Sequence, residues 1–404
     1  MENFQKSQKL NNVHYEIRGK VMNEACKMEK ENIDILKLNI GNPATFNFKA
    51  PNYVVSNITQ NMNLAEGYSE SKGIEEARIS IVKYFESKNI FNINSNDIYL
   101  GNGVSELILM SMQALLNPGD EILIPAPDYP LWTAAATLSG GNVVHYICDE
   151  KSDWNPDLED IKRKITSKTK AIVIINPNNP TGAVYPEEIL QGIVKLAREN
   201  NLFIFSDEIY DRLVMDDIKH ISIASLAPDI CTITFNGLSK SDMIAGYRIG
   251  WMCISGNKEK AKDYIEGLNL LSSMRLCPNV PAQFAVTKAL ENTEYIKTFL
   301  KPGGRIYNQR EIVYNALNNI DGVSVVKPKA AFYIFPKIDI NKFNIKSDEK
   351  FALDLLHQEK ILIVHGTGLN WNEPDHFRLV YLPEEKILKT AMTRMNLFFE
   401  NYKQ

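Results

Sequence analysis

The sequence predicts an α/β fold: a large domain with a mostly parallel sheet sandwiched by helices, followed by a smaller α+β domain. Short apolar runs alternate with segments of helical periodicity from about Asp97 to Ser255. Runs of this kind, β-branched or aromatic and apolar on both faces, are typical of buried parallel strands. The segment Pro302-Gly303-Gly304 then breaks the chain. The helix and short strands expected after this break indicate the second domain.

Four apolar runs predict strands of the large sheet, and polar residues follow each of them. The runs are Ile98–Leu100, Glu121–Ile124, Ala171–Ile175 and Leu202–Phe205. Ligands of open α/β sheets bind outside the carboxyl ends of the strands. We therefore expect one pocket, formed by the segments Gly101–Ser105, Ala126–Trp132, Asn176–Gly182 and Asp207–Tyr210.

A helix is expected to begin at Gly103-Val104-Ser105, because an apolar-periodic segment follows up to Leu116. The free N–H groups and the positive dipole end of a helix N-terminus suit a phosphate group. The Ser105 hydroxyl either joins that phosphate site or simply caps the helix. In the smaller domain, three further runs predict strands: Val323–Val326, Ala331–Phe335 and Phe377–Tyr381.

Two basic residues carry the most chemical information. Lys240 follows an apolar run that includes Phe235, and Arg248 lies eight residues further on. A lysine amine can form a Schiff base with an aldehyde, and an arginine offers a planar fork of donors to a phosphate. Together they indicate pyridoxal phosphate, although a lysine near an arginine is by itself usually a pair of solvated side chains. The polar segments at the other strand ends support the assignment of this pair to a cofactor site.

The chain resembles a known family over nearly its whole length. The motifs that carry the resemblance surround Asn179, Asp207, Lys240 and Arg248, with further ones at Asn12–Gly19, Leu38–Pro43, Ala126–Trp132 and Met274–Cys277. They are similar to those of the fold-type I, pyridoxal-phosphate-dependent aminotransferases of class I/II, and look closest to the bacterial glutamate–pyruvate (alanine) branch. The resemblance implies amino-group transfer between L-alanine or pyruvate and 2-oxoglutarate or L-glutamate through a Schiff base.

The resemblance also implies a role for each candidate residue at the cofactor. Lys240 is the catalytic lysine, which anchors the cofactor and moves a proton once substrate displaces it. Asp207 keeps the pyridine nitrogen protonated, so that the ring accepts electrons from the substrate carbon. The other cofactor-binding positions are Gly103, Val104, Ser105 and Arg248 at the phosphate, Ser239 beside Lys240, Asn179 and Tyr210 at the phenolic oxygen, Tyr129 stacked on the ring, and Tyr68 from a neighbouring subunit.

For the substrate, the resemblance implies that Arg378 clamps the α-carboxylate through two hydrogen bonds, with Gly41 and Asn179 assisting. Arg18 and Tyr15 belong to an N-terminal segment that we expect to fold over the site and contact the distal carboxylate of glutamate.

Each candidate also has a plainer interpretation from the sequence alone. Asp207 would form a turn or a helix cap, the segment Asn176–Gly182 only a turn, and Tyr129 ordinary packing. Arg378 would be a solvated charge at a strand edge, and Tyr68 an exposed loop aromatic. The N-terminal segment would be a solvated tail.

Length and composition suit a cytoplasmic metabolic enzyme. With 404 residues we expect an N-terminal segment over residues 1–52 that packs with the small domain, a large cofactor-binding domain over 53–300 and a small domain over 301–404. The net charge of −4, with acids and bases interspersed, argues against nucleic acid or a membrane surface as a partner. No segment is apolar for long enough to span a bilayer. Five scattered cysteines without CxxC spacing predict neither disulfides nor a metal site. The resemblance implies a homodimer with shared active sites.

Five residues, at three places in the chain, depart from the family pattern. Ser241-Asp242-Met243 stands where relatives usually carry Thr, an aromatic and a basic residue, Gly237 where Ser is common, and Ala330 where Gly is common. An acid near a phosphate site is unexpected, because like charges repel. These departures bear on phosphate affinity and substrate preference rather than on the identity of the cofactor.

Other functions stay open from the sequence. The same scaffold supports aminotransferases of aromatic or branched amino acids, and a carbon–sulfur β-lyase would use the same Lys240 and Asp207 to eliminate a β-substituent. A non-enzymatic regulator is disfavoured, because every expected catalytic residue is present and neither a basic patch nor a helix-turn-helix extension is found.

Overall fold

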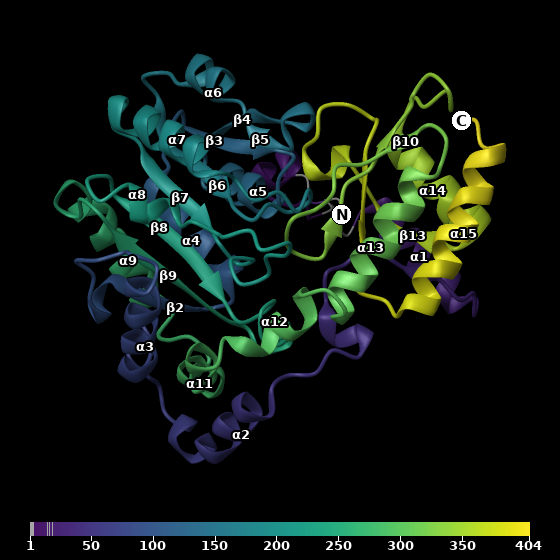
Figure 1. Ribbon diagram of the computed structural model, residues 1–404. Coiled ribbons are helices and arrows are strands. Elements are labelled where there is room, and N and C mark those ends of the chain that lie inside the picture. The colour runs from purple at the N-terminus through teal and green to yellow at the C-terminus, as the bar shows by residue number, and fades with distance from the viewer. Residues whose placement is uncertain (1–3, 14, 16, 18) are drawn as a thin grey trace.

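The computed structural model describes residues 4–13, 15, 17 and 19–404, and an eight-stranded sheet forms its centre (Figure 1). From one edge to the other, the strands are β2 (Ile98–Asn102), β9 (Ile249–Ser255), β8 (Thr232–Gly237), β7 (Phe203–Asp207), β6 (Thr169–Ile175), β3 (Glu121–Ala126), β4 (Asn142–Asp149) and β5 (Asn155–Pro156). Strands β9 and β5 run antiparallel to their neighbours, whereas the pairs from β8 to β4 are parallel. The predicted mostly parallel sheet is therefore confirmed.

Helices cover both faces of this sheet, because successive side chains of a strand point to opposite sides. On one face, side chains such as Phe205 and Phe235 pack against α4 (Val104–Leu115), α5 (Leu131–Leu138) and α9 (Lys262–Met274). On the other face lie α6 (Leu158–Lys164), α7 (Glu187–Glu199), α8 (Ile223–Leu226), α3 (Glu75–Glu86) and α11 (Ala285–Glu291). The remaining helices of this part are α2 (Asn52–Gln60), α10 (Val280–Gln283) and α12 (Glu294–Leu300).

The C-terminal residues form a second packed unit, coloured green to yellow in Figure 1. Its helices are α13 (Arg305–Asn318), α14 (Asp348–Glu359) and α15 (Glu385–Asn401), and its strands are β10 (Val323–Ser324), β11 (Tyr333–Ile334), β12 (Lys337–Ile338), β13 (Ile361–Leu362), β14 (Val364–His365) and β15 (Phe377–Val380). Their apolar side chains share one core around Phe351 and Phe399. The predicted α/β class with a smaller mixed unit is thus observed.

Two of the predicted C-terminal strands are shorter than the sequence suggested. Only Val323 and Ser324 of the run Val323–Val326 enter a ladder, and only Tyr333 and Ile334 of the run Ala331–Phe335. Pro328 and Pro336 follow these runs, and proline has no N–H to continue a ladder. Apolar character alone therefore overestimated the strand lengths.

The N-terminal part of the chain contacts the C-terminal unit. Strand β1 (Leu36–Lys37) pairs in parallel with β13, and α1 (Lys20–Lys30) packs beside α14. Val21 and Ala25 of α1 belong to the same apolar core as the C-terminal residues. These contacts agree with an N-terminal segment that packs with the small domain, and the domain bounds at residues 52 and 300 stay a proposal.

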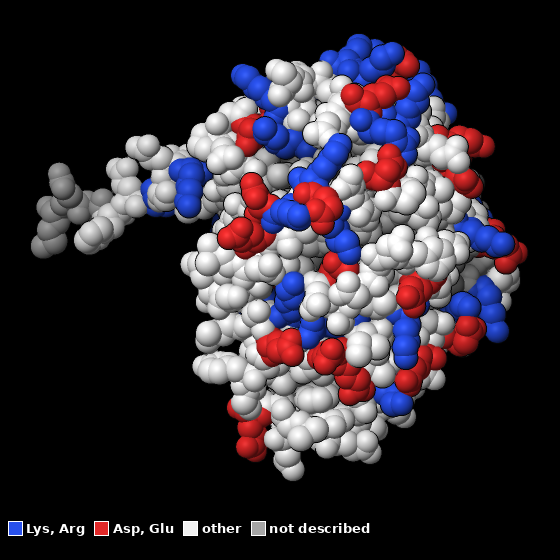
Figure 2. All heavy atoms as spheres, turned by 90° about the vertical axis from the view of Figure 1, so that its left-hand side faces the viewer, with Lys and Arg blue, Asp and Glu red and all other residues white. Residues whose placement is uncertain are grey.

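The described ranges contain no helix that is both long enough and apolar enough to cross a membrane. Figure 2 shows acidic and basic side chains interspersed over the face that it presents.

Candidate active site

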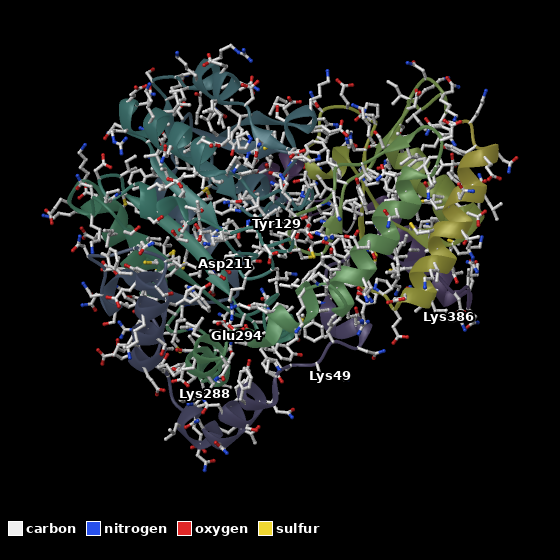
Figure 3. The ribbon with its side chains drawn as sticks, viewed as in Figure 1. Lys49, Tyr129, Asp211, Lys288, Glu294 and Lys386 are labelled. Carbon is white, nitrogen blue, oxygen red and sulfur yellow. The ribbon has the colours of Figure 1, made fainter. Side chains whose placement is uncertain are left out.

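A cavity of about 230 Å³ lies at the carboxyl ends of the central strands. The predicted site residues that line it are Tyr15, Gly41, Val104, Ser105, Tyr129, Asn179, Asp207, Tyr210, Ser239, Lys240, Arg248 and Arg378. Figure 3 places Tyr129 between the central sheet and the C-terminal unit, so the cavity lies where the two units meet. A larger cleft of about 1630 Å³ lies beside α3 and α12, but none of the predicted site residues lines it. The chemistry therefore belongs to the smaller cavity.

Lys240 and Arg248 lie on the loop that joins β8 to β9. Within this antiparallel pair Gly237 faces Gly250, and a Cβ atom at Gly237 would lie 2.8 Å from the Ile249 carbonyl oxygen and 2.9 Å from Gly250 Cα. The glycine found at position 237 thus permits the close approach of the two strands. The Lys240 ammonium donates a hydrogen bond to the Gly41 carbonyl oxygen at 2.7 Å.

The N-terminus of α4 and the Arg248 guanidinium form one end of the cavity. Gly103 is the N-cap, with φ of +80°, and a Cβ atom there would collide with the Arg248 guanidinium. Arg248 donates to the carbonyl oxygens of Asn102 and Ala245, both at 3.1 Å. Ser105 lies inside the helix rather than at its cap, and it lines the cavity. Helix N–H groups, a hydroxyl and a guanidinium together fit a phosphate dianion.

Asp207 ends β7 at another wall of the cavity and is 3% exposed. One carboxylate oxygen accepts from the indole N–H of Trp132 at 3.2 Å, and the other accepts from the backbone N–H of Ile209 at 3.3 Å. Burial raises the pKa of Asp207 to about 6, because the carboxylate is removed from water. A protonated ring nitrogen beside it would favour the charged form. In the sequence Trp132 belongs only to the motif Ala126–Trp132, and nothing there predicts its contact with Asp207.

Arg378 is buried, with 2% exposure, so the sequence-based alternative of a solvated strand-edge charge is wrong. It donates to the Asn179 side-chain oxygen at 3.0 Å and to the Asn39 carbonyl oxygen, while its Nε has no partner. Among the described residues, no carboxylate lies within ion-pair distance of it. Burial lowers the pKa of this guanidinium. A buried cation without a counterion is costly, so this wall of the cavity is built to receive an anion.

Two pairs of tyrosines line the cavity. The hydroxyls of Tyr15 and Tyr129 lie 3.2 Å apart, and those of Tyr210 and Tyr333 lie 2.9 Å apart. Tyr333 also carries the Arg378 guanidinium over its ring, 4.6 Å from the centroid. From the sequence, Tyr333 is predicted only as a residue of a strand. Its proximity to Arg378 depends on the pairing of β11 with β15, which sequence periodicity does not specify.

Two predicted residues do not line the cavity, and one lies outside the described residues. Gly103 does not line the cavity, and its lack of a side chain leaves room for the Arg248 guanidinium. Tyr68 is 82% exposed, so within a single chain it is an exposed loop aromatic. Its expected role toward a neighbouring subunit stays a prediction. Arg18 falls outside the described residues, and its predicted contact with substrate stays a prediction as well.

The unusual Asp242 does not line the cavity. It is buried and forms an ion pair with Arg212 at 2.7 Å, while Met243 enters the core. The predicted repulsion of a phosphate by Asp242 is therefore relieved by Arg212. Ala330 forms an isolated bridge with Val214, which tolerates a methyl side chain.

One group of side chains has the composition of a metal site. Glu208, Asp211 and His220 offer atoms within 4.8 Å of one another, behind the strand end that carries Asp207. The Lys88 ammonium already binds the Asp211 carboxylate there. Lys88 therefore already supplies a positive charge to this group. The absence of a metal site stays a prediction.

Comparisons with known proteins agree with this geometry. Residues 33–394 match the aminotransferase class I and II family. The glutamate–pyruvate aminotransferase AlaA of Haemophilus influenzae is 57% identical over 404 residues, which cover all of both chains. A crystal structure of an aminotransferase from Escherichia coli shares 55% identity with a TM-score of 0.99, again over all of both chains. An alanine aminotransferase from Pyrococcus furiosus shares 39% identity with a TM-score of 0.93, over 98% of this chain and 100% of that one.

The family match covers most of the chain, and relatives of more than half identity match it over its full length. The chain belongs to the class I and II aminotransferases.

Proposed function

We propose that the protein is a pyridoxal-phosphate-dependent aminotransferase that moves an amino group between L-alanine or pyruvate and 2-oxoglutarate or L-glutamate. Arg378 carries this proposal: it is buried, has no ion-pair partner among the described residues, faces the same cavity as the Lys240 amine and offers a fixed site for an α-carboxylate. The names of the relatives from Haemophilus influenzae and Pyrococcus furiosus support the choice of substrates. A cytoplasmic location stays a prediction.

The residues of the cavity fit this cofactor at each end. When bound, the cofactor supplies an electron sink for the substrate carbon. The α4 N-terminus with Ser105 and Arg248 would hold its phosphate, and Asp207 would hold the proton of its ring nitrogen. Tyr129 lines the cavity and would cover one face of the ring, as the family does at this position. Asn179 and Tyr210 would donate to its phenolic oxygen.

Lys240 is placed to carry a proton within the cavity. Its amine reaches the Gly41 carbonyl oxygen, on the segment that we expect to assist the substrate carboxylate. The carbonyl orients the amine, which is half-buried where it enters the cavity. Because Asn179 links to Arg378 through its side-chain oxygen, the substrate clamp and the cofactor wall are fixed to each other.

A panel of amino donors and 2-oxo acids, assayed with the purified protein, tests this function. We expect glutamate with pyruvate and alanine with 2-oxoglutarate to be the fastest pairs. Borohydride reduction followed by peptide mapping should place the cofactor on Lys240. Release of ammonia and pyruvate from cystathionine, faster than any transamination, would favour the β-lyase alternative. Preference for aromatic or branched donors would contradict the proposed substrates.

Arg378 and Arg18 are expected to separate the two carboxylate contacts. Arg378→Ala should raise KM for all four substrates by about a hundredfold, because it removes a two-bond, charge-assisted contact. Arg18→Ala should impair glutamate and 2-oxoglutarate by about tenfold, with alanine and pyruvate nearly unchanged. Steady-state kinetics with each substrate measure both effects, and Arg378→Lys tests whether charge alone suffices. Equal losses for both substrate pairs after Arg18→Ala would remove Arg18 from distal recognition.

The active unit that we propose is a homodimer. Several large apolar side chains are exposed, including Leu64, Tyr68, Met274 and Leu276. The Arg275 guanidinium donates to the Ser71 carbonyl oxygen at 2.6 Å, so the segments that carry these residues lie together. Exposed apolar residues that gather in this way are typical of an interface, and a second copy of the chain would cover them.

Mixed dimers test whether the sites are shared. A Lys240→Ala chain combined with a Tyr68→Phe chain yields one site with both residues intact, provided Tyr68 serves the neighbour's cofactor. Isolated heterodimers should therefore regain up to about half of the wild-type kcat, since one site in two is complete. Subunit exchange between tagged chains, followed by purification on both tags, provides the sample. Heterodimers no more active than either parent would exclude a shared site.

A further inference from the structure

Tyr333 occupies a junction between the two units of the protein. It lies on β11 of the C-terminal unit, is 3% exposed and lines the cavity. Its hydroxyl lies 2.9 Å from the Tyr210 hydroxyl, which belongs to the segment after β7 of the central sheet. Its ring lies under the Arg378 guanidinium, 4.6 Å away. One side chain thus contacts a cofactor-facing group and the substrate clamp.

A third contact fixes the Tyr333 hydroxyl. A Cβ atom built on Gly41 would collide with this hydroxyl, so it packs directly against the backbone whose carbonyl accepts from Lys240. Burial acts to raise the pKa of Tyr333, but the positive charges of Lys240 and Arg378 outweigh it and lower that pKa. The pKa of Tyr210 is raised, mainly by burial. Each hydroxyl carries one proton, so a Tyr210 hydroxyl that donates to the cofactor accepts from Tyr333 across this 2.9 Å contact.

We propose that Tyr333 is a positioning residue for the transamination reaction, with separate roles for its two parts. The hydroxyl donates to Tyr210 and so strengthens Tyr210 as a donor to the cofactor's phenolic oxygen. The ring supports the Arg378 guanidinium from below and holds it in the orientation that receives a carboxylate. This inference rests on the proposed function, and it adds a residue that couples the two halves of the site.

The two roles predict different defects. Tyr333→Phe keeps the ring and removes the hydroxyl, so Tyr210 becomes a weaker donor and the phenolic oxygen keeps more of its negative charge. That oxygen then holds the neighbouring proton more tightly, and the pH midpoint of the bound cofactor's absorbance change should rise by about half a unit or more. KM for the four substrates should stay within about twofold, because the ring still supports Arg378. Tyr333→Leu removes the ring and should raise KM for all four substrates by about fivefold or more.

Tyr381→Phe is a matched control. Tyr381 is buried in the same unit, and its hydroxyl bonds to the carbonyl oxygens of Ala330 and Ala331, outside the cavity. This variant loses a buried hydroxyl without touching Tyr210 or Arg378, so the absorbance midpoint and KM should stay at wild-type values. A Tyr210→Phe, Tyr333→Phe double variant should shift the midpoint no further than Tyr210→Phe alone, since both act through one bond.

The outcomes separate this inference from the proposed function. Wild-type protein that binds no pyridoxal phosphate would contradict the function itself. Wild-type protein that binds cofactor and transaminates, with an unshifted midpoint in Tyr333→Phe, would overturn the role of the hydroxyl. An unchanged KM in a folded Tyr333→Leu variant would overturn the role of the ring, and additive midpoint shifts in the double variant would show that Tyr333 does not act through Tyr210.

Discussion

Lys240→Ala is expected to abolish transamination while leaving the fold intact. Among the described residues, Lys240 is the single lysine that lines the cavity, and its ammonium donates a hydrogen bond there to the Gly41 carbonyl oxygen. Removing a general acid–base group costs about 10²–10⁴ in rate, and the loss of covalent anchoring adds to that cost. We expect kcat to fall by at least about 10⁴-fold. The melting temperature of the cofactor-free protein should change little, because one hydrogen bond is lost.

Lys195→Ala is the matched control. Lys195 lies on α7 with its side chain 73% exposed and only a 3.9 Å contact to Glu199, so its removal should alter neither rate nor stability. Single-turnover assays with glutamate, read from the absorbance of the bound cofactor, would measure the loss in Lys240→Ala directly. Residual activity above about one per cent of wild type would assign the proton transfer to another group.

Asp207→Asn should lower kcat by about 10²-fold or more, because a neutral amide cannot hold a proton on the ring nitrogen of the cofactor. The same change should stabilise the cofactor-free protein at neutral pH. Burial raises the pKa of Asp207 from the ordinary 3.8 to about 6, so the folded state binds more protons than the unfolded chain between these values. The stability that protonated Asp207 contributes is therefore lost as the pH rises from about 4 to 6. An asparagine at this position does not titrate, so the variant does not lose stability in this range.

The predicted gain in stability is tested over a range of pH, with a second buried carboxylate as the control. Urea unfolding of the cofactor-free proteins should show an advantage for Asp207→Asn that grows from pH 4 to pH 6 and is constant above. Asp128→Asn is matched, since Asp128 is fully buried and burial raises its pKa to about 6 too, but its bonds go to Thr133 and Asn370. It should lose less than about tenfold in kcat. Equal losses of kcat in the two variants would deny Asp207 a special role.

The sequence was sufficient for part of the sheet and for one wall of the site. Apolar runs followed by polar residues predicted β2, β3, β6 and β7 because buried parallel strands leave their carboxyl ends at one edge. Lys240, Asp207 and Asn179 follow such strands, and the structure brings them to one cavity. Local order along the chain was enough for these residues.

Contacts between distant segments could not be predicted in the same way. Tyr333 and Trp132 appear in the sequence as ordinary aromatics of a strand and a helix, and only the tertiary pairing brings them to Arg378 and Asp207. The acid at Asp242 appeared unfavourable because its partner Arg212 is thirty residues earlier in the chain. Arg378 was assigned through resemblance, since composition alone indicated an exposed charge and cannot report burial.

The pairing of β8 with β9 has a consequence for how this site tolerates change. Lys240 and Arg248 lie on one loop whose two ends are fixed by the register of Gly237 with Gly250. The distance between the proposed covalent anchor and the proposed phosphate-binding guanidinium is therefore set by the length of that loop, and far less by the identity of the residues within it. Substitutions such as Ser241, Asp242 and Met243 can accumulate there as long as each finds a partner or a place in the core. An inserted or deleted residue would shift the amine relative to the guanidinium, and no side chain elsewhere could restore the spacing.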